Sequence, residues 1–293
     1  MRALFVVLAV QVVLGATFAV LAATGNIPFT SDEPEGRAAR ADRFDSATAF
    51  SLLREQVELG PRPAGSRASR ELGERLRGLL PGGRFEPVPG GLRNVVGEVP
   101  GRDPRRRVVV GAHYDTKDIP GFLGANDGAS GTAVAVQLAR TLKPRQLGPS
   151  VVFVLFDGEE SPRETPDSEF EQRGLRGSKA IAPRLRGAEA MVLLDFVGDG
   201  RLSIPREANS DEALWSRLRA AAGRVGSGGA FPPAVTGAVS DDHLPFIEAG
   251  VPSIDLIDFT FPCFHRPCDD LSAVSESSLD KTGETVLELL TTL

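Results

Sequence analysis

The sequence predicts one α/β domain with a mixed, mostly parallel central β-sheet flanked by helices on both faces. Short apolar runs typical of strands alternate with longer amphipathic segments typical of helices, and this order favours parallel strands joined by crossover helices. Two of the runs, at 151–156 and within 190–196, are continuously apolar, as expected of strands covered on both faces. The chain shows no internal repeat and no second apolar core, so we expect a single domain.

The predicted elements begin at residue 44. Phe44–Leu59 has the apolar spacing of a helix, and a turn at 60–66 separates it from a second helix that ends near Leu80. Ser66 is placed to cap this second helix. Further strands are expected at 93–99, 107–112, 151–156, 190–196 and 251–257, and further helices at 129–142, 211–222 and 276–290.

Residues 1–23 are predicted to form a hydrophobic helix outside this domain. The apolar run that follows Arg2 reaches the roughly 20 residues needed to cross a bilayer and exceeds the roughly 7–15 residues of a signal-peptide core. We interpret it as a membrane anchor, with a cleaved signal peptide or a buried helix as alternatives. Residues 24–43 are predicted to be a linker. An anchored or a secreted protein would work outside the cytoplasm, in agreement with the position of Arg2.

Charge and cysteine usage narrow the possible partners and ligands. The formal net charge is -6 and no basic patch stands out, which argues against nucleic acid as a partner. The two cysteines, Cys263 and Cys268, flank His265, and an extracytoplasmic setting permits a disulfide that would pin this loop. Two free thiols are an equal alternative. Thiolate ligation of a metal is less favoured because carboxylates are abundant nearby.

All three histidines lie in acid-rich motifs. Imidazole and carboxylate together form the ligand set of a zinc-type metal, so we predict a metal site, although each motif alone fits an ordinary structural role. The motifs are Gly-Ala-His-Tyr-Asp at 111–115, Asp-Asp-His-Leu-Pro-Phe at 241–246 and Cys-Phe-His-Arg-Pro-Cys-Asp-Asp at 263–270.

Several acids complete the candidate site. Asp127 lies in Gly-Ala-Asn-Asp-Gly-Ala-Ser-Gly (124–131), where glycines permit a sharp turn before a helix. Glu159 and Glu160 end the motif Phe-Asp-Gly-Glu-Glu, and we expect their side chains to diverge, one toward metal and one toward substrate as an acid or base. Most candidates fall at the C-terminal ends of predicted strands, where open α/β sheets build their sites. The five candidate ligands are His113, Asp127, Glu160, Asp195 and His265.

The combination of motifs resembles that of the co-catalytic zinc aminopeptidases (peptidase clan MH, family M28) and their relatives, the glutaminyl-peptide cyclotransferases. The motifs that carry the resemblance are those at 60–66, 112–115, 124–131 and 156–160, together with the last histidine, His265. The resemblance covers about Phe44 to the C-terminus and implies a zinc-exopeptidase-like catalytic domain at 44–293. It implies that Asp127, Glu160 and His265 bind the zinc common to both branches. In the peptidases, His113 and Asp195 would complete a second zinc site bridged by Asp127, with Glu159 as general base.

The motif at 241–246 resembles the cyclotransferase pattern more closely. There, the acid matched by Asp241 hydrogen-bonds the acid matched by Asp195, whereas the peptidases usually carry Ser or Thr. The cyclotransferases usually place one tryptophan where this chain has Phe264 and another just after the Glu-Glu pair, where the segment 161–176 has none. The resemblance therefore leaves the pocket for a glutamine side chain open.

The resemblance favours a one-zinc enzyme that converts the N-terminal glutamine of peptides or proteins to pyroglutamate and releases ammonia. Glu159, Asp195 and Asp241 would be its catalytic residues and Phe264 would line the substrate pocket. A two-zinc aminopeptidase is the alternative, and an inactive binding domain of the same fold is a third possibility.

Other prominent residues are expected to be structural. Asp115 is expected to orient His113 or nearby backbone, with a surface position as the alternative. The remainder comprise Arg62 in the turn at 60–66, Asp242 and His243 as braces of their loop, Trp215 in the core, and a solvated acidic loop at 164–171 near the mouth of the site.

Overall fold

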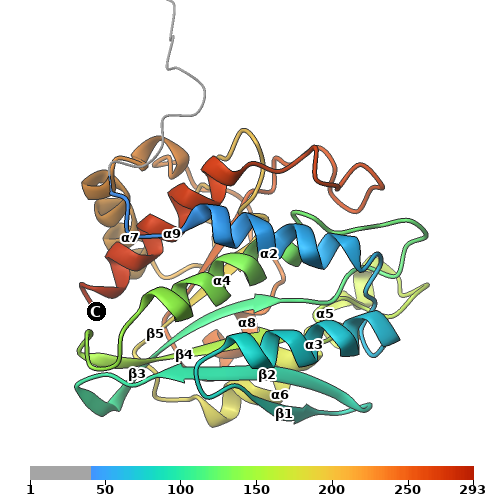
Figure 1. The fold of residues 1–293 in the computed structure, drawn as a ribbon, viewed down its shortest axis with the longest axis horizontal. Coiled ribbons are helices and arrows are strands. Elements are labelled where there is room, and N and C mark those ends of the chain that lie inside the picture. Colours follow the sequence, from blue (N-terminus) through green and yellow to red (C-terminus); the bar gives the residue numbers. More distant parts are fainter. Residues whose placement is uncertain (1–40) are drawn as a thin grey trace, which may run out of the picture. The chain divides into compact units, whose positions relative to one another are not determined.

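A six-stranded sheet organises residues 41–293, the part of the chain that the structure, a computed structural model, describes (Figure 1). The strand order is β1-β2-β4-β3-β5-β6, in which β4, β3, β5 and β6 run parallel and β1 and β2 pair antiparallel at one edge. This confirms the predicted mixed, mostly parallel sheet. The strands are β1 (Arg84–Val88), β2 (Leu92–Val99), β3 (Asp103–His113), β4 (Pro149–Phe156), β5 (Ala190–Asp195) and β6 (Ser253–Ile257).

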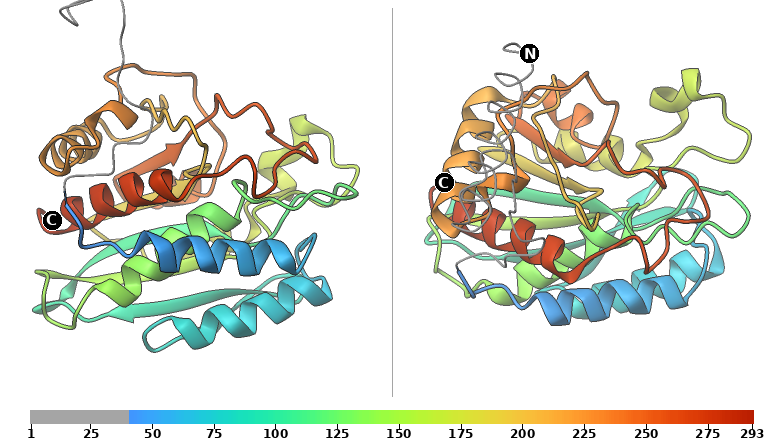
Figure 2. Two further views of the ribbon diagram at one scale, coloured as in Figure 1. Left: turned by 45° about the horizontal axis from the view of Figure 1, so that its top comes forward. Right: turned by 90° about the horizontal axis from the view of Figure 1, so that it is seen from above.

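Helices cover both faces of the sheet, as predicted. On one face lie α2 (Ser46–Glu58), α3 (Arg67–Leu79), α4 (Ala129–Thr141), α7 (Glu212–Val225) and α9 (Glu276–Leu290), and on the other lie α6 (Arg176–Ile181) and α8 (Leu244–Glu248). Side chains alternate along each strand, so Val108 and Val110 join the first core and Val109 the second. Figure 2 shows α2 and α9 side by side over the larger core.

The boundaries of the longer elements agree with the sequence prediction to within a few residues. Ser66 caps α3 by accepting a hydrogen bond from the N–H of Ser69, as expected. Strand β1 was not predicted, because Arg-Phe-Glu-Pro-Val lacks a clear apolar alternation and forms an edge strand, where proline is tolerated. The remaining short elements are α5 (Phe170–Arg173), η1 (Asp167–Glu169), η2 (Ala182–Arg184) and η3 (Gly228–Ala230).

The predicted hydrophobic helix at 1–23 and most of the predicted linker at 24–43 lie outside the described residues. Within 41–293, no helix is long and apolar enough to span a bilayer. The described chain is first fixed at Arg43 and Phe44, whose backbone N–H groups both donate to the buried carboxylate of Glu284 in α9. These bonds tie the segment that leads into α2 to helix α9.

Candidate active site

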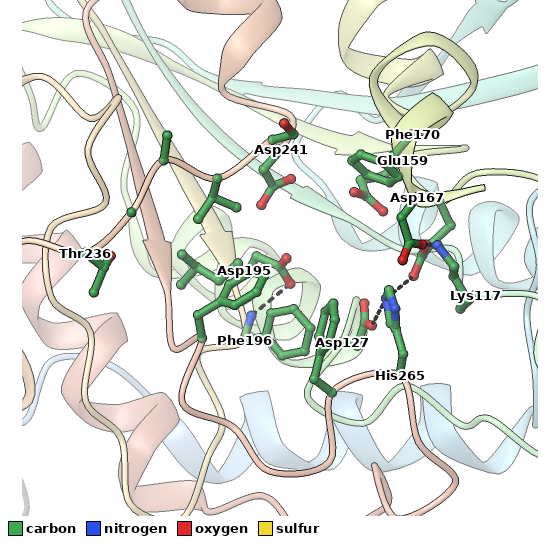
Figure 3. Close-up of a pocket in the computed structure, with 18 residues that line it drawn as sticks. Lys117, Asp127, Glu159, Asp167, Phe170, Asp195, Phe196, Thr236, Asp241 and His265 are labelled. Atoms are coloured by element: carbon green, nitrogen blue, oxygen red, sulfur yellow. Dashed lines mark hydrogen bonds and ion pairs between the residues drawn. The ribbon is translucent and has the colours of Figure 1, made fainter. Parts of the chain in front are cut away.

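The predicted site residues gather at the carboxyl ends of the parallel strands. His113 ends β3, Asp195 ends β5, and Glu159 and Glu160 lie in the turn that follows β4. A cavity of about 430 Å³ opens there, and its wall includes seven of the predicted residues (Figure 3). These seven are Asp127, Glu159, Glu160, Asp195, Asp241, Phe264 and His265. His113, which is 1% exposed, is buried and contacts Asp127 and Asp195.

Two sets of side chains are arranged to hold a metal ion, and they share Asp127. In the first set, His265 Nε2 lies 3.4 Å from Asp127 Oδ2 and 3.3 Å from Glu160 Oε1. In the second, His113 Nε2 lies 3.2 Å from Asp127 Oδ1 and 3.4 Å from Asp195 Oδ1. The two oxygens of Asp127 thus face different sets, which is the geometry of a bridging carboxylate.

The hydrogen-bond pattern also fits a cation. Within residues 41–293, His113 Nε2, Asp127 Oδ2 and Glu160 Oε1 are buried without a hydrogen-bond partner. Buried polar atoms are rarely left unpartnered, and nitrogen and carboxylate oxygen are the donors that zinc accepts. The donor atoms of each set lie within 4.8 Å of one another. The residues present therefore fit zinc at either position.

The Asp115 carboxylate holds the turn that carries Glu159 and Glu160 by accepting hydrogen bonds from the backbone of that turn. Asp115 Oδ1 accepts from the N–H groups of Gly158 and Glu159, at 2.9 Å and 3.2 Å, and Oδ2 accepts from that of Glu160 at 3.3 Å. The backbone carbonyl of Asp115 also lies 3.1 Å from His113 Nδ1. Asp115 is fully buried, so its predicted orienting role is supported and the alternative of a surface position is wrong.

The loop that carries Asp127 is held from two sides. The buried Arg62 guanidinium donates to the carbonyl oxygens of Leu123 and Gly124, at 2.9 Å and 3.2 Å. Burial lowers the pKa of Arg62 to about 10, so it stays cationic at neutral pH. The Asp269 carboxylate accepts from the N–H groups of Asn126 and Asp127, at 2.7 Å and 3.1 Å. Arg62 therefore has a structural role, as expected, and the segment that it holds in place is the loop that carries Asp127.

The carboxylates of Glu159 and Glu160 contact different histidines, His113 and His265 respectively, and the two acids differ electrostatically. Burial raises the pKa of Glu159 well above its usual value, and the charge of Glu160 adds to this effect. Burial also acts on Glu160, but the nearby His265 imidazole and the Lys117 ammonium, 2.9 Å away, outweigh burial and lower the pKa to about 2. In the metal-free protein Glu160 is thus the ionised partner, and Glu159 holds a proton more readily.

Asp195 and Asp241 form a second pair of acids at the cavity wall. Figure 3 shows their carboxylates and that of Glu159 directed toward a common space. Burial raises the pKa of Asp195 to about 8 in the absence of metal, and the charge of Asp241 contributes to the shift. Asp195 Oδ1 accepts from the N–H of Phe196 at 2.8 Å, which fixes its orientation at the end of β5.

His243 and Asp242 brace the structure behind this pair, as predicted. His243 is fully buried, with Nε2 3.3 Å from Glu207 Oε1 and Nδ1 3.8 Å from Asp255 Oδ2. Asp242 accepts a hydrogen bond of 2.5 Å from Ser178 Oγ. Trp215, also as predicted, is 4% exposed and belongs to the larger core.

The disulfide that the sequence left open is present. Cys263 and Cys268 are bonded to each other, so neither is a free thiol or a thiolate ligand. Phe264 lies between them, is 39% exposed and stacks on His265 with ring centroids 3.9 Å apart. It lines the cavity at the place where a substrate-pocket residue was expected.

Several cavity residues were not predicted from the sequence. The segment 161–176 lacks tryptophan but contributes Phe170 to the cavity wall. Asp167, which is exposed and also lines the cavity, belongs to the acidic loop that was expected near the site mouth. An aromatic residue in an otherwise polar stretch was the available signal for Phe170. The other unpredicted wall residues are Lys117, Phe196, Ile257, Phe259 and the stretch 236–240.

Comparison with known proteins agrees with this geometry. The model of the peptidase family M28 matches residues 94–290. The glutaminyl-peptide cyclotransferase of Bothrops jararaca is 29% identical over 273 residues, which cover 77% of this chain and 73% of that protein. Aminopeptidase YwaD of Bacillus subtilis is 30% identical over 195 residues, covering 61% of this chain and 39% of YwaD.

Solved structures show the same fold. The glutaminyl cyclase of Porphyromonas gingivalis superimposes with a TM-score of 0.76 at 28% identity, over 85% of this chain and 99% of that one. A zinc-dependent exopeptidase from Parabacteroides distasonis gives a TM-score of 0.74 at 26% identity, over 87% of this chain and 100% of that one. The chain therefore belongs to peptidase family M28 and is an enzyme of the glutaminyl cyclase or aminopeptidase type.

Proposed function

We propose that the protein is a zinc-dependent glutaminyl-peptide cyclotransferase that acts on the N-terminal glutamine of peptides or proteins. The observation that carries this proposal is the pairing of Asp241 with Asp195 at the cavity wall. Because Asp195 and Asp241 lie side by side, the two carboxyl groups can together bind the α-amine of a substrate. The names of the cyclotransferase and cyclase relatives support the same reaction.

Asp127, Glu160 and His265 would hold a single zinc ion in this enzyme. Their donor atoms converge, and both Asp127 Oδ2 and Glu160 Oε1 are buried without a hydrogen-bond partner within 41–293. When bound there, zinc supplies a Lewis acid that polarises the γ-carbonyl group of the substrate glutamine. Lys117 would keep Glu160 ionised and in place through its 2.9 Å contact.

The reaction forms a bond from the α-amine nitrogen to the γ-carbon and breaks the bond from that carbon to the amide nitrogen. Asp195 and Asp241 would accept hydrogen bonds from the α-amine and orient its lone pair. Glu159, which lines the cavity beside this pair, would take a proton from the attacking amine and donate it to the departing ammonia. The apolar side chains of Phe170 and Phe264 would limit the access of competing water.

A two-zinc aminopeptidase is the second candidate, and the arrangement of His113, Asp127 and Asp195 favours it. These residues would hold a second zinc, with Asp127 as bridge. Glu159 would then act as general base toward the water that attacks the first peptide bond. The two candidates share Glu159 and the zinc site of Asp127, Glu160 and His265, but they differ in metal content and product.

A direct assay separates the two functions. The purified protein is incubated with a Gln-initiated peptide and, in parallel, with a Leu-initiated peptide, while ammonia and free amino acid are both measured. We expect ammonia and a pyroglutamyl product from the first peptide, no free leucine from the second, and one zinc per chain by mass spectrometry. Free leucine without ammonia, with two zinc ions per chain, would establish the aminopeptidase instead. The Glu159→Gln variant should lose either activity and retain zinc.

We also propose that the enzyme works outside the cytoplasm, held by residues 1–23 as a membrane anchor or secreted after their removal. The disulfide supports this proposal, because such bonds persist in oxidising compartments. Fractionation of cells that express the full chain should place it in the membrane or extracellular fraction and accessible to external protease. Recovery in the soluble cytoplasm would contradict the proposal.

A further inference from the structure

The metal-ligand candidate His265 lies inside a small covalent ring. The disulfide joins Cys263 and Cys268, which are 5 residues apart, and Phe264 and His265 lie between them. His265 has a φ of 50°, in the left-handed region that residues other than glycine seldom adopt. Such a conformation persists only when the surroundings hold it.

Each end of the ring is fixed to a different part of the site. On one side, Cys263 packs against the cluster of Phe196, Ile257 and Phe261, of which Phe196 and Ile257 line the cavity. On the other side, Asp269, which follows Cys268, binds the backbone N–H groups of the Asp127 loop. The disulfide thus links the hydrophobic wall to the loop that carries the bridging carboxylate.

The contacts inside the ring are few. The N–H of Arg266 donates to the carbonyl oxygen of Cys263 at 3.0 Å, and the Arg266 guanidinium donates to that of Pro262 at 3.2 Å. Residues 266–268 are exposed. The imidazole of His265 stacks on Phe264, and Phe122 meets it edge-on with centroids 6.1 Å apart. Phe264 also packs against Phe196 and Phe259, with ring centroids 5.5 Å and 5.1 Å apart. Within residues 41–293, the backbone of His265 itself makes no hydrogen bond, so its left-handed conformation depends on the ring around it.

We propose that the Cys263–Cys268 disulfide positions His265 and Phe264, and that its reduction inactivates the enzyme by loosening zinc. The inference rests on the proposed function, because it takes His265 as a zinc ligand and Phe264 as a substrate-pocket wall. In the oxidised ring, the imidazole is held 3.3–3.4 Å from the facing oxygens of Asp127 and Glu160. In the reduced chain, rotation of the segment out of the left-handed conformation withdraws the imidazole from both.

The exposed position of Cys268 makes the bond accessible to a dithiol. One thiolate of the dithiol attacks Sγ of Cys268 and forms a mixed disulfide, and Cys263 leaves as a thiolate. The second thiolate of the dithiol then attacks the other sulfur of the same dithiol molecule, which is bonded to Cys268 in the mixed disulfide, and Cys268 leaves as a thiolate. The protein gains two electrons and two protons, and the dithiol becomes a cyclic disulfide.

The effect should be local. A disulfide stabilises a fold mainly by restricting the unfolded chain, and this restriction is small for a short loop. The zinc-free forms with and without the bond should therefore melt at similar temperatures. Zinc retention should differ, because residues that orient a metal ligand typically change metal affinity by about 10–100-fold.

The test compares the full-length, zinc-loaded protein with the Cys263→Ser/Cys268→Ser variant. Zinc release to a chromogenic chelator is followed before and after treatment with a phosphine, which reduces disulfides without chelating as a dithiol does. We expect release about tenfold faster or more in the variant and in the reduced wild type, with no further change when the variant is treated. Arg266→Ala, which alters an exposed side chain of the same ring and leaves the bond intact, serves as the matched control.

Zinc release within twofold of the oxidised wild type in the reduced protein would overturn the proposal, even if the double variant failed to fold. A loss of melting temperature in the zinc-free variant equal to that of the zinc-loaded variant would overturn it as well, because the bond would then act on the whole fold. Zinc release does not depend on any substrate. If the wild type retained zinc through the disulfide but turned over neither peptide, the proposed function alone would fail.

Discussion

Asp115 shows how one buried side chain organises the site. Its two oxygens accept from three consecutive backbone N–H groups, those of residues 158–160. Those groups belong to the turn that presents a candidate zinc ligand, Glu160, and the candidate proton carrier, Glu159. Small rotations of this turn would move both carboxylates together, because they share one backbone segment.

Replacement of Asp115 by Asn tests this dependence. The amide keeps the size of the side chain but turns one acceptor into a donor that faces a backbone N–H. We expect kcat/KM to fall by about 10–100-fold and the free energy of unfolding to fall by about 1–3 kcal/mol. Steady-state kinetics and urea unfolding measure the two effects. Asp103→Asn, in an acid that accepts a backbone N–H at the surface, should change neither, and unaltered kinetics in the Asp115 variant would refute its role.

At the scale of single residues, the candidate metal ligands were easier to predict from the sequence than the residues that line the cavity wall. The five candidate ligands lie in short motifs whose residue types are typical of metal binding. The structure brings them together as two sets that share Asp127, with His113 and Asp195 in one and Glu160 and His265 in the other. Phe170 and Lys117 carry no such motif. Both line the cavity, Lys117 from the loop after β3 and Phe170 from the short helix α5, and sequence spacing does not encode the path of these segments.

At the scale of elements, α4 and β5 set the distance between Asp127 and Asp195. Gly131 in the first turn of α4 allows the close approach, since a Cβ added there would lie 2.0 Å from the carbonyl oxygen of Leu194. That oxygen belongs to the residue before Asp195. The helix that follows the Asp127 loop is thus seated directly on the strand that ends in the partner acid.

Gly131→Ala should therefore destabilise the protein and disturb the site together. Displacement of α4 from β5 is expected to cost about 1–3 kcal/mol of unfolding free energy and to lower zinc retention. Gly78→Ala in α3 is the matched control, because a Cβ there meets nothing within 4 Å and alanine is favoured over glycine in a helix by about 0.5–1 kcal/mol. Chemical denaturation measures both variants, and equal stability of the two would show that Gly131 is not needed for close packing.

The elements themselves were predictable in proportion to their apolar periodicity. Strands β4 and β5 are buried along their whole length and appear in the sequence as continuous apolar runs. Strand β3 begins at Asp103, before the predicted start at residue 107. The prediction missed this first part because its residues, Asp-Pro-Arg-Arg-Arg, show no apolar pattern and only the second half of the strand is buried. Helices α6 and α8 have 6 and 5 residues, too few for a helical period to show.

For the molecule as a whole, the site concentrates acids in a buried region. Asp127, Glu159, Glu160, Asp195 and Asp241 are each at most 6% exposed, and the nearest cationic side chain at the cavity wall is Lys117. Carboxylates buried together repel one another and lose hydration. Zinc would neutralise much of this charge, so its binding and the stability of the fold should be coupled.

Removal of zinc should therefore lower the melting temperature, and its return should restore it. A ligand at 100 times its Kd stabilises the folded state by about 2.7 kcal/mol, which for a domain of this size corresponds to roughly 5–10 °C. Calorimetry of the protein with a chelator, and again after addition of zinc in excess, measures the shift. His265→Gln removes a ligand of the proposed site and should abolish most of the response, whereas a shift of wild-type size in that variant would place the stabilising zinc elsewhere. His243→Gln, which alters a buried histidine outside both ligand sets, should keep the zinc response whatever its own cost in stability.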